Sequence, residues 1–224
     1  MQLTENSVGR KLLMAVTGAL LLGFVIVHLL GNSSVFLGPD GINSYAENLH
    51  NLGPIVWVFR LVMLGLIVVH IWFGVSLTLE NSAATPIGYA SQEYRRATFS
   101  SRTMIYTGLA LLAFIIYHLL HFTVQITDVE FAARQNMDAI NRPDVFGMVV
   151  NGFKQTFTTV LYVVAMIVLF LHLSHGVQSI LQTVGLSNDK SLPVVTLAGK
   201  GLAFVLLLGY ISIPILIIAG IVKI

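Results

Sequence analysis

The chain contains no cysteine among its 224 residues. This absence excludes disulfides, zinc–thiolate centres, Cys-ligated iron–sulfur clusters and covalently attached c-type haem. Charged residues are also scarce, at 10% of the chain, whereas a soluble domain carries about a quarter. The net charge of +2 is too small and too scattered for a nucleic-acid-binding protein. What the chain has in abundance is hydrophobic residues, which make up 56% of it.

Five apolar segments are long enough to span a bilayer. They lie at residues 12–30, 55–79, 104–126, 157–181 and 202–222. The first follows Arg10 and Lys11, as the apolar part of a signal peptide would, but it is longer than such a segment and no small-residue cleavage site follows it. We therefore expect a retained helix and a single all-α membrane domain over residues 1–224, built as a bundle of five transmembrane helices.

The distribution of Lys and Arg predicts the orientation. With the N-terminus in the cytoplasm, seven Lys or Arg residues lie on the inner side and five on the outer side. The connection between the first two spans, residues 32–54, contains neither. Because positively charged loops stay in the cytoplasm, we expect the N-terminus inside and the C-terminus outside.

Histidine is the polar residue that stands out within the spans. Six of the seven histidines lie inside them, and His50 is the exception. An ionisable side chain within the membrane is costly and indicates a functional site by default. A hydrogen bond to a neighbouring helix explains one such histidine, but it is an insufficient explanation for six on four helices. At a rise of about 1.5 Å per residue, three lie toward the outer side and three toward the inner side. The outer ones are His28, His118 and His121, and the inner ones are His70, His172 and His175.

Each of these two layers receives histidines from two helices. Two imidazoles on facing helices at one depth are the ligands of a six-coordinate haem b, with the flat macrocycle lying between the helices. The sequence therefore predicts two haems b between the first four helices, one in the outer layer and one in the inner layer.

An internal repeat selects the outer ligands. Residues 17–30 are echoed by residues 107–120, with a Thr-Gly pair at the start of each and a histidine near its end. In this alignment His28 corresponds to His118, whereas His121 corresponds to a glycine. We predict His28 and His118 as the ligands of the outer haem iron.

A weaker repeat selects the inner ligands. Residues 70–75 are echoed by residues 172–177, so that His70 corresponds to His172 and His175 corresponds to a phenylalanine. We predict His70 and His172 as the ligands of the inner haem iron.

Several neighbours of these ligands have two explanations. Gly74 and Gly176 each lie four residues after a ligand, on the same helix face, where a missing side chain would let a porphyrin edge approach the backbone. Ordinary helix packing through small residues explains them equally well. His121 and His175 are candidates for contacts with haem propionates or rings, and hydrogen bonds between helices are the alternative.

With these features the chain resembles the di-haem cytochrome b subunit of succinate:quinone oxidoreductases, in the type with a single five-helix anchor polypeptide. The resemblance covers nearly the whole chain. It rests on the Thr-Gly and His pattern of the third span, on the His-x-x-x-Gly patterns of the second and fourth, and on a histidine in each of the first four.

The resemblance implies a place in a respiratory complex of the inner (cytoplasmic) membrane. His70 and His172 would hold the proximal haem, near a cytoplasmic iron–sulfur subunit, and His28 and His118 the distal haem. The implied partners are that iron–sulfur subunit and an FAD-containing flavoprotein that interconverts fumarate and succinate. This chain, embedded in lipid, would oxidise or reduce quinone, most often menaquinone in this type, and the family often pairs two heterotrimers.

A quinone site needs a proton acceptor near a haem edge. Glu47, in the outer connection before the second span, is the candidate because it resembles the family's outer acidic residue, although its spacing from His28 differs. Asn43 and His50 lie one helical turn to either side of it and join the candidate site. All three are explained equally well as surface polar residues.

Three arginines border the second inner connection, namely Arg95, Arg96 and Arg102. They are candidates for contacts with inner haem propionates or with the iron–sulfur subunit. As positive charges on the cytoplasmic side they need no further role.

Other functions fit part of the pattern. A cytochrome b anchor of a hydrogenase or formate dehydrogenase is also a membrane haem protein, but its ligands are distributed differently. A proton-coupled transporter with a histidine relay would have broken helices and acids near the midplane, whereas Pro214, in the span without histidine, is the one breaker here. A purely structural anchor without redox activity is the remaining alternative.

Overall fold

The computed structural model describes residue 4 and residues 6–84 and 97–224. Over these residues the regular structure is helical, apart from an isolated β-bridge between Met137 and Pro143. Five of the described helical segments are long and apolar enough to cross a membrane. They are α1 (Ser7–Asn32) with its 3₁₀ extension η1 (Ser33–Leu37), α3 (Pro54–Ala83), α5 (Met104–His118) with its π-helical extension η2 (Leu119–Val124), α7 (Thr156–Thr183) and α8 (Leu192–Ile218). The prediction of an all-α protein with five such helices is confirmed.

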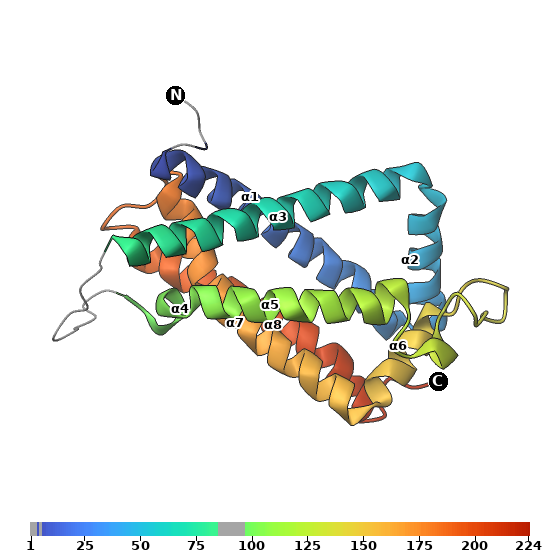
Figure 1. Ribbon diagram of the computed structural model, residues 1–224. Helices are drawn as coiled ribbons and strands as arrows, with labels where there is room; N and C mark the ends of the chain where they lie inside the picture. The colour runs from blue at the N-terminus through green and yellow to red at the C-terminus, as the bar shows by residue number, and fades with distance from the viewer. Residues whose placement is uncertain (1–3, 5, 85–96) are drawn as a thin grey trace.

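Shorter helices lie at the ends of the bundle. They are α2 (Pro39–Asn51), α4 (Phe99–Arg102), η3 (Val129–Phe131) and α6 (Val145–Lys154). Helix α1 begins at one end of the molecule, and α8 finishes at the opposite end (Figure 1). We call the end where α1 begins the N-terminal end and the end where α8 finishes the C-terminal end. Helices α2 and α6 lie at the C-terminal end, and α4 lies at the N-terminal end (Figure 1).

Capping residues determine where the long helices begin. Helix α1 starts at Ser7, earlier than the predicted span, because the side chain of Asn6 accepts a hydrogen bond of 2.6 Å from the N–H of Gly9. Helices α3 and α8 each start with a proline in the first two positions, where the missing N–H does no harm. Hydropathy therefore marks the apolar part of each helix, whereas the caps mark its ends.

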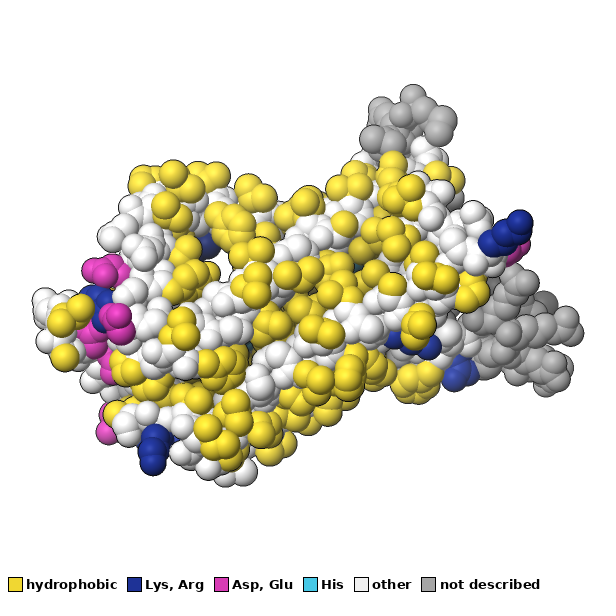
Figure 2. Space-filling model, turned by 180° about the vertical axis from the view of Figure 1, so that it is seen from behind, with side chains coloured by type: hydrophobic (Ala, Val, Ile, Leu, Met, Phe, Trp, Pro, Cys, Tyr) yellow, Lys and Arg dark blue, Asp and Glu magenta, His cyan; other side chains and the backbone are white. Residues whose placement is uncertain are grey.

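The long helices form two antiparallel pairs, α1 with α3 and α5 with α7, and α8 packs along α7 (Figure 1). Figure 2 shows hydrophobic side chains over the middle of the molecule, with acidic and basic side chains gathered toward its two ends. Helix α3 also exposes large apolar side chains, including Trp57 (63% exposed) and Trp72 (69% exposed). A continuous apolar surface of this kind is typical of a bundle that faces lipid.

The best-packed core lies at the C-terminal end of the bundle. Phe146, Val150 and Phe153 of α6 are buried there against Tyr162 of α7 and Ile217 of α8. By contrast, none of the described residues in the most apolar stretch of α3 is buried. Among the described residues, the hydrophobic core cluster therefore lies where α6, with Ile42 of α2, covers the C-terminal end of the bundle, and we call α2 and α6 together the end cap.

Asn43 joins α2 to the segment that leads into α6. Its side chain is 1% exposed, and its amide group donates to the carboxylates of Asp138 (3.1 Å) and Asp144 (3.3 Å). Its amide oxygen accepts from the N–H of Phe146 at 2.9 Å. These three bonds use both ends of the amide, so the structure places Asn43 inside the end cap.

Arg142 completes the same end cap with an ionic network. Its guanidinium donates to Asp138 (2.8 and 2.9 Å), to Asp40 (2.9 Å) and to the hydroxyl of Ser44 (2.6 Å). Hydrogen bonds from the Arg142 backbone N–H and guanidinium, together with those from Asn43 and Ile140, lower the pKa of Asp138 to about 2. The network ties the segment before α6 to the first turns of α2.

We expect Asn43→Ala to lower the free energy of unfolding by about 1–3 kcal/mol, because it takes the hydrogen-bond acceptor from the buried N–H of Phe146 and one donor from each of the carboxylates of Asp138 and Asp144. The measurement is thermal unfolding of the purified protein in detergent, followed by circular dichroism. Asn51→Ala is the matched control, since Asn51 is exposed on the same helix. Equal midpoints for the two variants would contradict the role assigned to Asn43.

The Asp138–Arg142 contact also predicts a pH dependence. Because the pKa of Asp138 in the folded protein lies below its ordinary value of about 3.8, its ionised form stabilises the fold above about pH 4, and this contribution is lost as the pH falls from about 4 to 2. We expect Asp138→Asn to lower the unfolding temperature at neutral pH and to flatten its decline over that acid range. Parallel profiles for the variant and the wild type would show that Asp138 makes no such contribution.

Candidate functional site

The intramembrane histidines form two facing pairs at different depths. His70 of α3 faces His172 of α7 toward the N-terminal end, and we call them the inner pair. His28 of α1 faces His118 of α5 toward the C-terminal end, and we call them the outer pair. The structure thus brings together the residues that the internal repeats pair.

The inner pair has the spacing that a shared metal requires. The centroids of the two imidazole rings lie 6.4 Å apart, with 68° between the ring planes. Two metal–imidazole bonds of about 2 Å, one on each side, place the ring centres about 6 Å apart. A pair of imidazoles is an incomplete donor set for a bare ion, but it suits haem iron, whose macrocycle supplies the other ligands.

The first Thr-Gly pair of the repeat lies against His70, the inner histidine of the neighbouring helix α3. Nδ1 of His70 lies 3.3 Å from the hydroxyl of Thr17 and 3.2 Å from the carbonyl of Met14. The Thr17 hydroxyl donates its proton to a carbonyl of its own helix, so Nδ1 must be the donor to it. A Cβ at Gly18 would lie 3.1 Å from Cε1 of His70, so the glycine lets the ring approach. Nε2 is left as the nitrogen that can bind a metal.

The second Thr-Gly pair lies in the same way against His172, the other histidine of the inner pair. The Thr107 hydroxyl lies 3.2 Å from Nδ1 of His172 and also bonds carbonyls of its own helix. A Cβ at Gly108 would lie 3.5 Å from Cε1 of His172. Each Thr-Gly pair therefore orients a histidine on the partner helix, as the outer shell of a metal site commonly does.

The outer pair is equally close but has different partners. The ring centroids of His28 and His118 lie 5.8 Å apart, at 86° to each other. Nδ1 of His118 bonds the hydroxyl of Tyr162 at 3.2 Å. Nε2 of His28 lies 3.3 Å from the side-chain amide of Asn32, which also bonds the His28 carbonyl at 2.7 Å. The outer pair thus also has the spacing for a shared haem iron.

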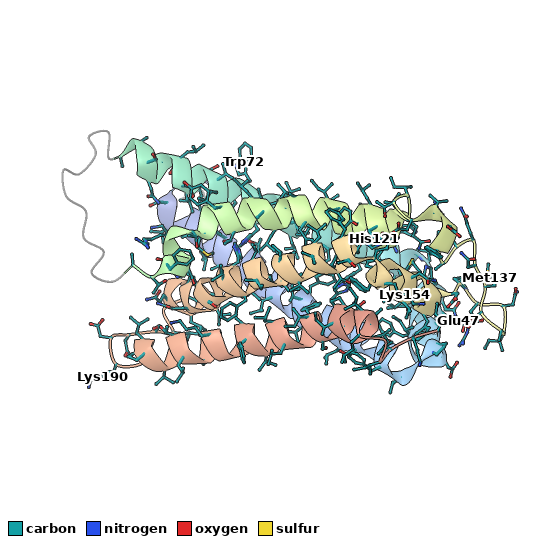
Figure 3. All side chains as sticks on the ribbon, turned by 90° about the horizontal axis from the view of Figure 1, so that it is seen from below. Glu47, Trp72, His121, Met137, Lys154 and Lys190 are labelled. Atoms are coloured by element: carbon teal, nitrogen blue, oxygen red, sulfur yellow. The ribbon has the colours of Figure 1, made fainter. Side chains whose placement is uncertain are left out.

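His121 lies in η2 beside the outer pair and is engaged at both ring nitrogens. It is 3% exposed, and Figure 3 shows it at the end of the bundle where Glu47, Met137 and Lys154 lie. Its Nδ1 lies 3.1 Å from the Tyr162 hydroxyl, and its Nε2 lies 2.9 Å from the carboxylate of Asp128. These contacts favour His118 over His121 as a metal ligand.

The remaining candidate residues are two glycines, His175 and three arginines. Among the described residues, a Cβ at Gly74 would meet only the Met14 sulfur, at 4.0 Å, and one at Gly176 would meet no atom within 4 Å. Close packing between helices therefore does not explain either glycine, and contact with a porphyrin edge stays a prediction. His175 is partly buried one turn beyond the inner pair. Arg102 is exposed at the end of α4, and Arg95 and Arg96 lie outside the described residues.

A groove of about 530 Å³ lies at the corner where α2 meets α3. It is lined by His50, Gly53, Pro54, Val56, Trp57 and Arg60. The Arg60 guanidinium lies 4.9 Å from the centre of the Trp57 ring. Nδ1 of His50 donates to the carbonyl of Ala46 at 2.8 Å, which leaves Nε2 free to accept a proton. The groove thus combines apolar walls, a cation and a base.

The groove contains only part of the predicted quinone site. His50 lines it, whereas Glu47 is exposed one turn earlier on α2 and Asn43 is buried in the end cap. Next in sequence to Arg60, but outside the groove lining, Phe59 has its ring centre 6.0 Å from that of Phe24, whose ring stacks on His28 at 5.2 Å.

Sequence reasoning missed several of these residues. Trp57 and Arg60 had a sequence signal, since aromatic and basic residues near one end of a span mark the interface. Tyr162 had a weaker one, because a buried tyrosine needs a hydrogen-bond partner. Asp128 and Asn32 carried no signal, because only the fold brings them to the histidines.

One comparison with known proteins identifies the family. A family model described as the succinate dehydrogenase/fumarate reductase transmembrane subunit matches residues 81–208, more than half of the chain. The match includes one histidine of each facing pair, His118 and His172. No curated protein and no solved structure matches the chain. With five helices able to span a membrane and this match over most of three of them, the chain belongs to the family of succinate dehydrogenase/fumarate reductase transmembrane subunits.

Proposed function

We propose that the chain is a di-haem cytochrome b anchor that carries electrons between menaquinol in the membrane and the iron–sulfur subunit of its complex. The proposal is supported mainly by the two pairs of facing histidines at different depths, His28 with His118 and His70 with His172. A haem b bound at each pair supplies one-electron redox chemistry. The two histidine pairs would determine where the haems lie and therefore the route of the electrons between the ends of the bundle.

The chain's own residues prepare each imidazole for its metal. Thr17 and Thr107 accept hydrogen bonds from Nδ1 of the inner ligands, so these rings keep Nε2 unprotonated. Fixed tautomers and ring orientations reduce the rearrangement that accompanies metal binding. Gly18 and Gly108 allow the rings to lie this close to the neighbouring helix.

We assign the N-terminal end to the cytoplasm. Counted in the sequence, the segments on the C-terminal side of the spans contain five Lys or Arg and six Asp or Glu, and those on the N-terminal side contain seven Lys or Arg and four Asp or Glu. This asymmetry follows the preference of basic residues for the cytoplasmic side. The inner pair would then be proximal to the iron–sulfur subunit, with the FAD-containing flavoprotein beyond it, and the arginines near α4 would face that subunit or the propionates.

We assign quinol oxidation to the groove at the corner of α2 and α3. The apolar walls and Trp57 suit a quinol ring, and the Nε2 atom of His50 is placed to accept a proton from its hydroxyl. The positive charge of Arg60 stabilises the negative charge that develops as that proton leaves. Glu47, exposed one turn away on α2, would pass the proton to the outer aqueous phase.

We expect the purified chain to contain two haems b, seen as a b-type α-band in the reduced-minus-oxidised spectrum and counted as pyridine haemochrome. His118→Ala and His172→Ala should each reduce the content from two haems per chain to one, because each removes one of two axial ligands. His50→Ala is the control and should retain both. A wild-type protein without a b-type band would refute the proposal.

The quinone assignment has its own test. We expect Glu47→Gln and His50→Ala to slow haem reduction by a menaquinol analogue in the assembled complex by about 10²-fold or more, as loss of a proton acceptor does. Glu130→Gln removes an exposed acid from the same end of the bundle and should leave the rate unchanged. Unchanged rates with full haem content in both variants would exclude this groove and leave the haem assignment intact.

A further inference from the structure

A line of hydrogen bonds runs from the outer pair to the surface of the C-terminal end. Nδ1 of His118 and Nδ1 of His121 lie 3.2 and 3.1 Å from the same Tyr162 hydroxyl. Nε2 of His121 then lies 2.9 Å from the Asp128 carboxylate, whose side chain is 23% exposed. The other oxygen of Asp128 accepts a hydrogen bond of 3.0 Å from the side-chain amide of Gln155. We call His118, Tyr162, His121 and Asp128 the outer relay.

One arrangement of protons satisfies every member of the outer relay. If His118 binds iron through Nε2, its Nδ1 carries a proton and donates to the Tyr162 oxygen. The Tyr162 hydroxyl then donates to Nδ1 of His121, whose Nε2–H donates to the Asp128 carboxylate. All donors therefore point the same way, from the iron ligand toward a negative charge.

Local backbone features hold the relay in place. The π-helical segment η2 follows His118 directly and contains His121, and π-turns occur frequently at functional sites. Gln125 ends this segment in the left-handed conformation, with φ of 60°, which is uncommon for a residue other than glycine. A Cβ at Gly152 of α6 would lie 3.1 Å from Nε2 of His121, so the His121 ring needs a glycine there.

We propose that Tyr162, His121 and Asp128 are positioning residues that make His118 a stronger electron donor to its iron and thereby lower the midpoint potential of the outer haem. The inference rests on the proposed function, because it takes His118 as a haem ligand. A hydrogen bond from Nδ1–H to an acceptor raises the basicity of a ligating imidazole. An anion at the end of the chain strengthens this effect, since cooperative hydrogen bonds polarise one another. Greater electron donation stabilises the oxidised iron.

The inner pair lacks an equivalent arrangement among the described residues. Nδ1 of His172 bonds the hydroxyl of Thr107, which in turn donates to backbone carbonyls of its own helix. Nδ1 of His70 bonds the hydroxyl of Thr17 and a carbonyl. The partners of the inner ligands are neutral, so the relay acts on one haem and separates the two potentials.

The test is a potentiometric titration of the two haems, followed at the α-band, in the wild type, Tyr162→Phe and Asp128→Asn. Tyr162→Phe keeps the ring that packs on Phe114 and Phe153 at 4.9 Å each, and Asp128→Asn removes the charge with little change of shape. Both variants should raise the potential of the outer haem, shift its low-spin electron paramagnetic resonance signal, and leave the inner haem unchanged. The haem that is lost in His118→Ala identifies the outer one.

Tyr210→Phe is the matched control. Tyr210 lies 6.4 Å from the His28 ring, and its hydroxyl donates to the carbonyl of Val25 at 2.7 Å and to no imidazole. Its removal should leave both potentials unchanged. Equal outer-haem potentials in the wild type and in either relay variant, at full haem content, would overturn the inference. Absence of haem from the wild type would instead overturn the proposed function on which it rests.

Discussion

A polar ring nitrogen buried in an apolar bundle needs a hydrogen-bond partner, because water is not available within the membrane to supply one. This constraint organises the histidines of the protein. Thr17 and Thr107 meet it for the inner pair, and Tyr162 meets it for His118. Each partner lies on a different helix from the ring that it holds, so the same hydrogen bonds that satisfy the imidazoles also join α1 to α3 and α5 to α7.

The two ends of the bundle are built differently, and the proposed functions follow this difference. At the C-terminal end, α2 and α6 cover the helices with a compact core, and Asn43 and Arg142 tie the cap together. The outer relay and the groove both lie at this end, next to the buried core of the end cap. Midway along the bundle most side chains are apolar and few are buried, as expected for helices that contact lipid and leave room for planar cofactors.

The family match covers residues 81–208, but the segment before it repeats one of the contacts found there. The Thr-Gly pair at residues 17–18 approaches His70 as the pair at residues 107–108 approaches His172. In each antiparallel pair one helix supplies the Thr-Gly pair and the other supplies the histidine that it contacts, so the two halves of the chain have the same arrangement at the inner pair. The relay at His118 has no counterpart among the described partners of His28.

The sequence alone determined the five apolar helices, the two depths of the histidines and the repeats that pair them, because bilayer thickness and helical rise convert residue number into depth. The sequence also predicted Glu47, Asn43 and His50 as one quinone site, but it could not show that three hydrogen bonds hold Asn43 inside the end cap. Only the tertiary structure showed that Thr17 supports His70, that His121 uses both nitrogens on Tyr162 and Asp128, and that Trp57 and Arg60 share a groove with His50. These contacts depend on how each helix is rotated about its axis and on which helices are neighbours, and periodicity along one chain contains neither.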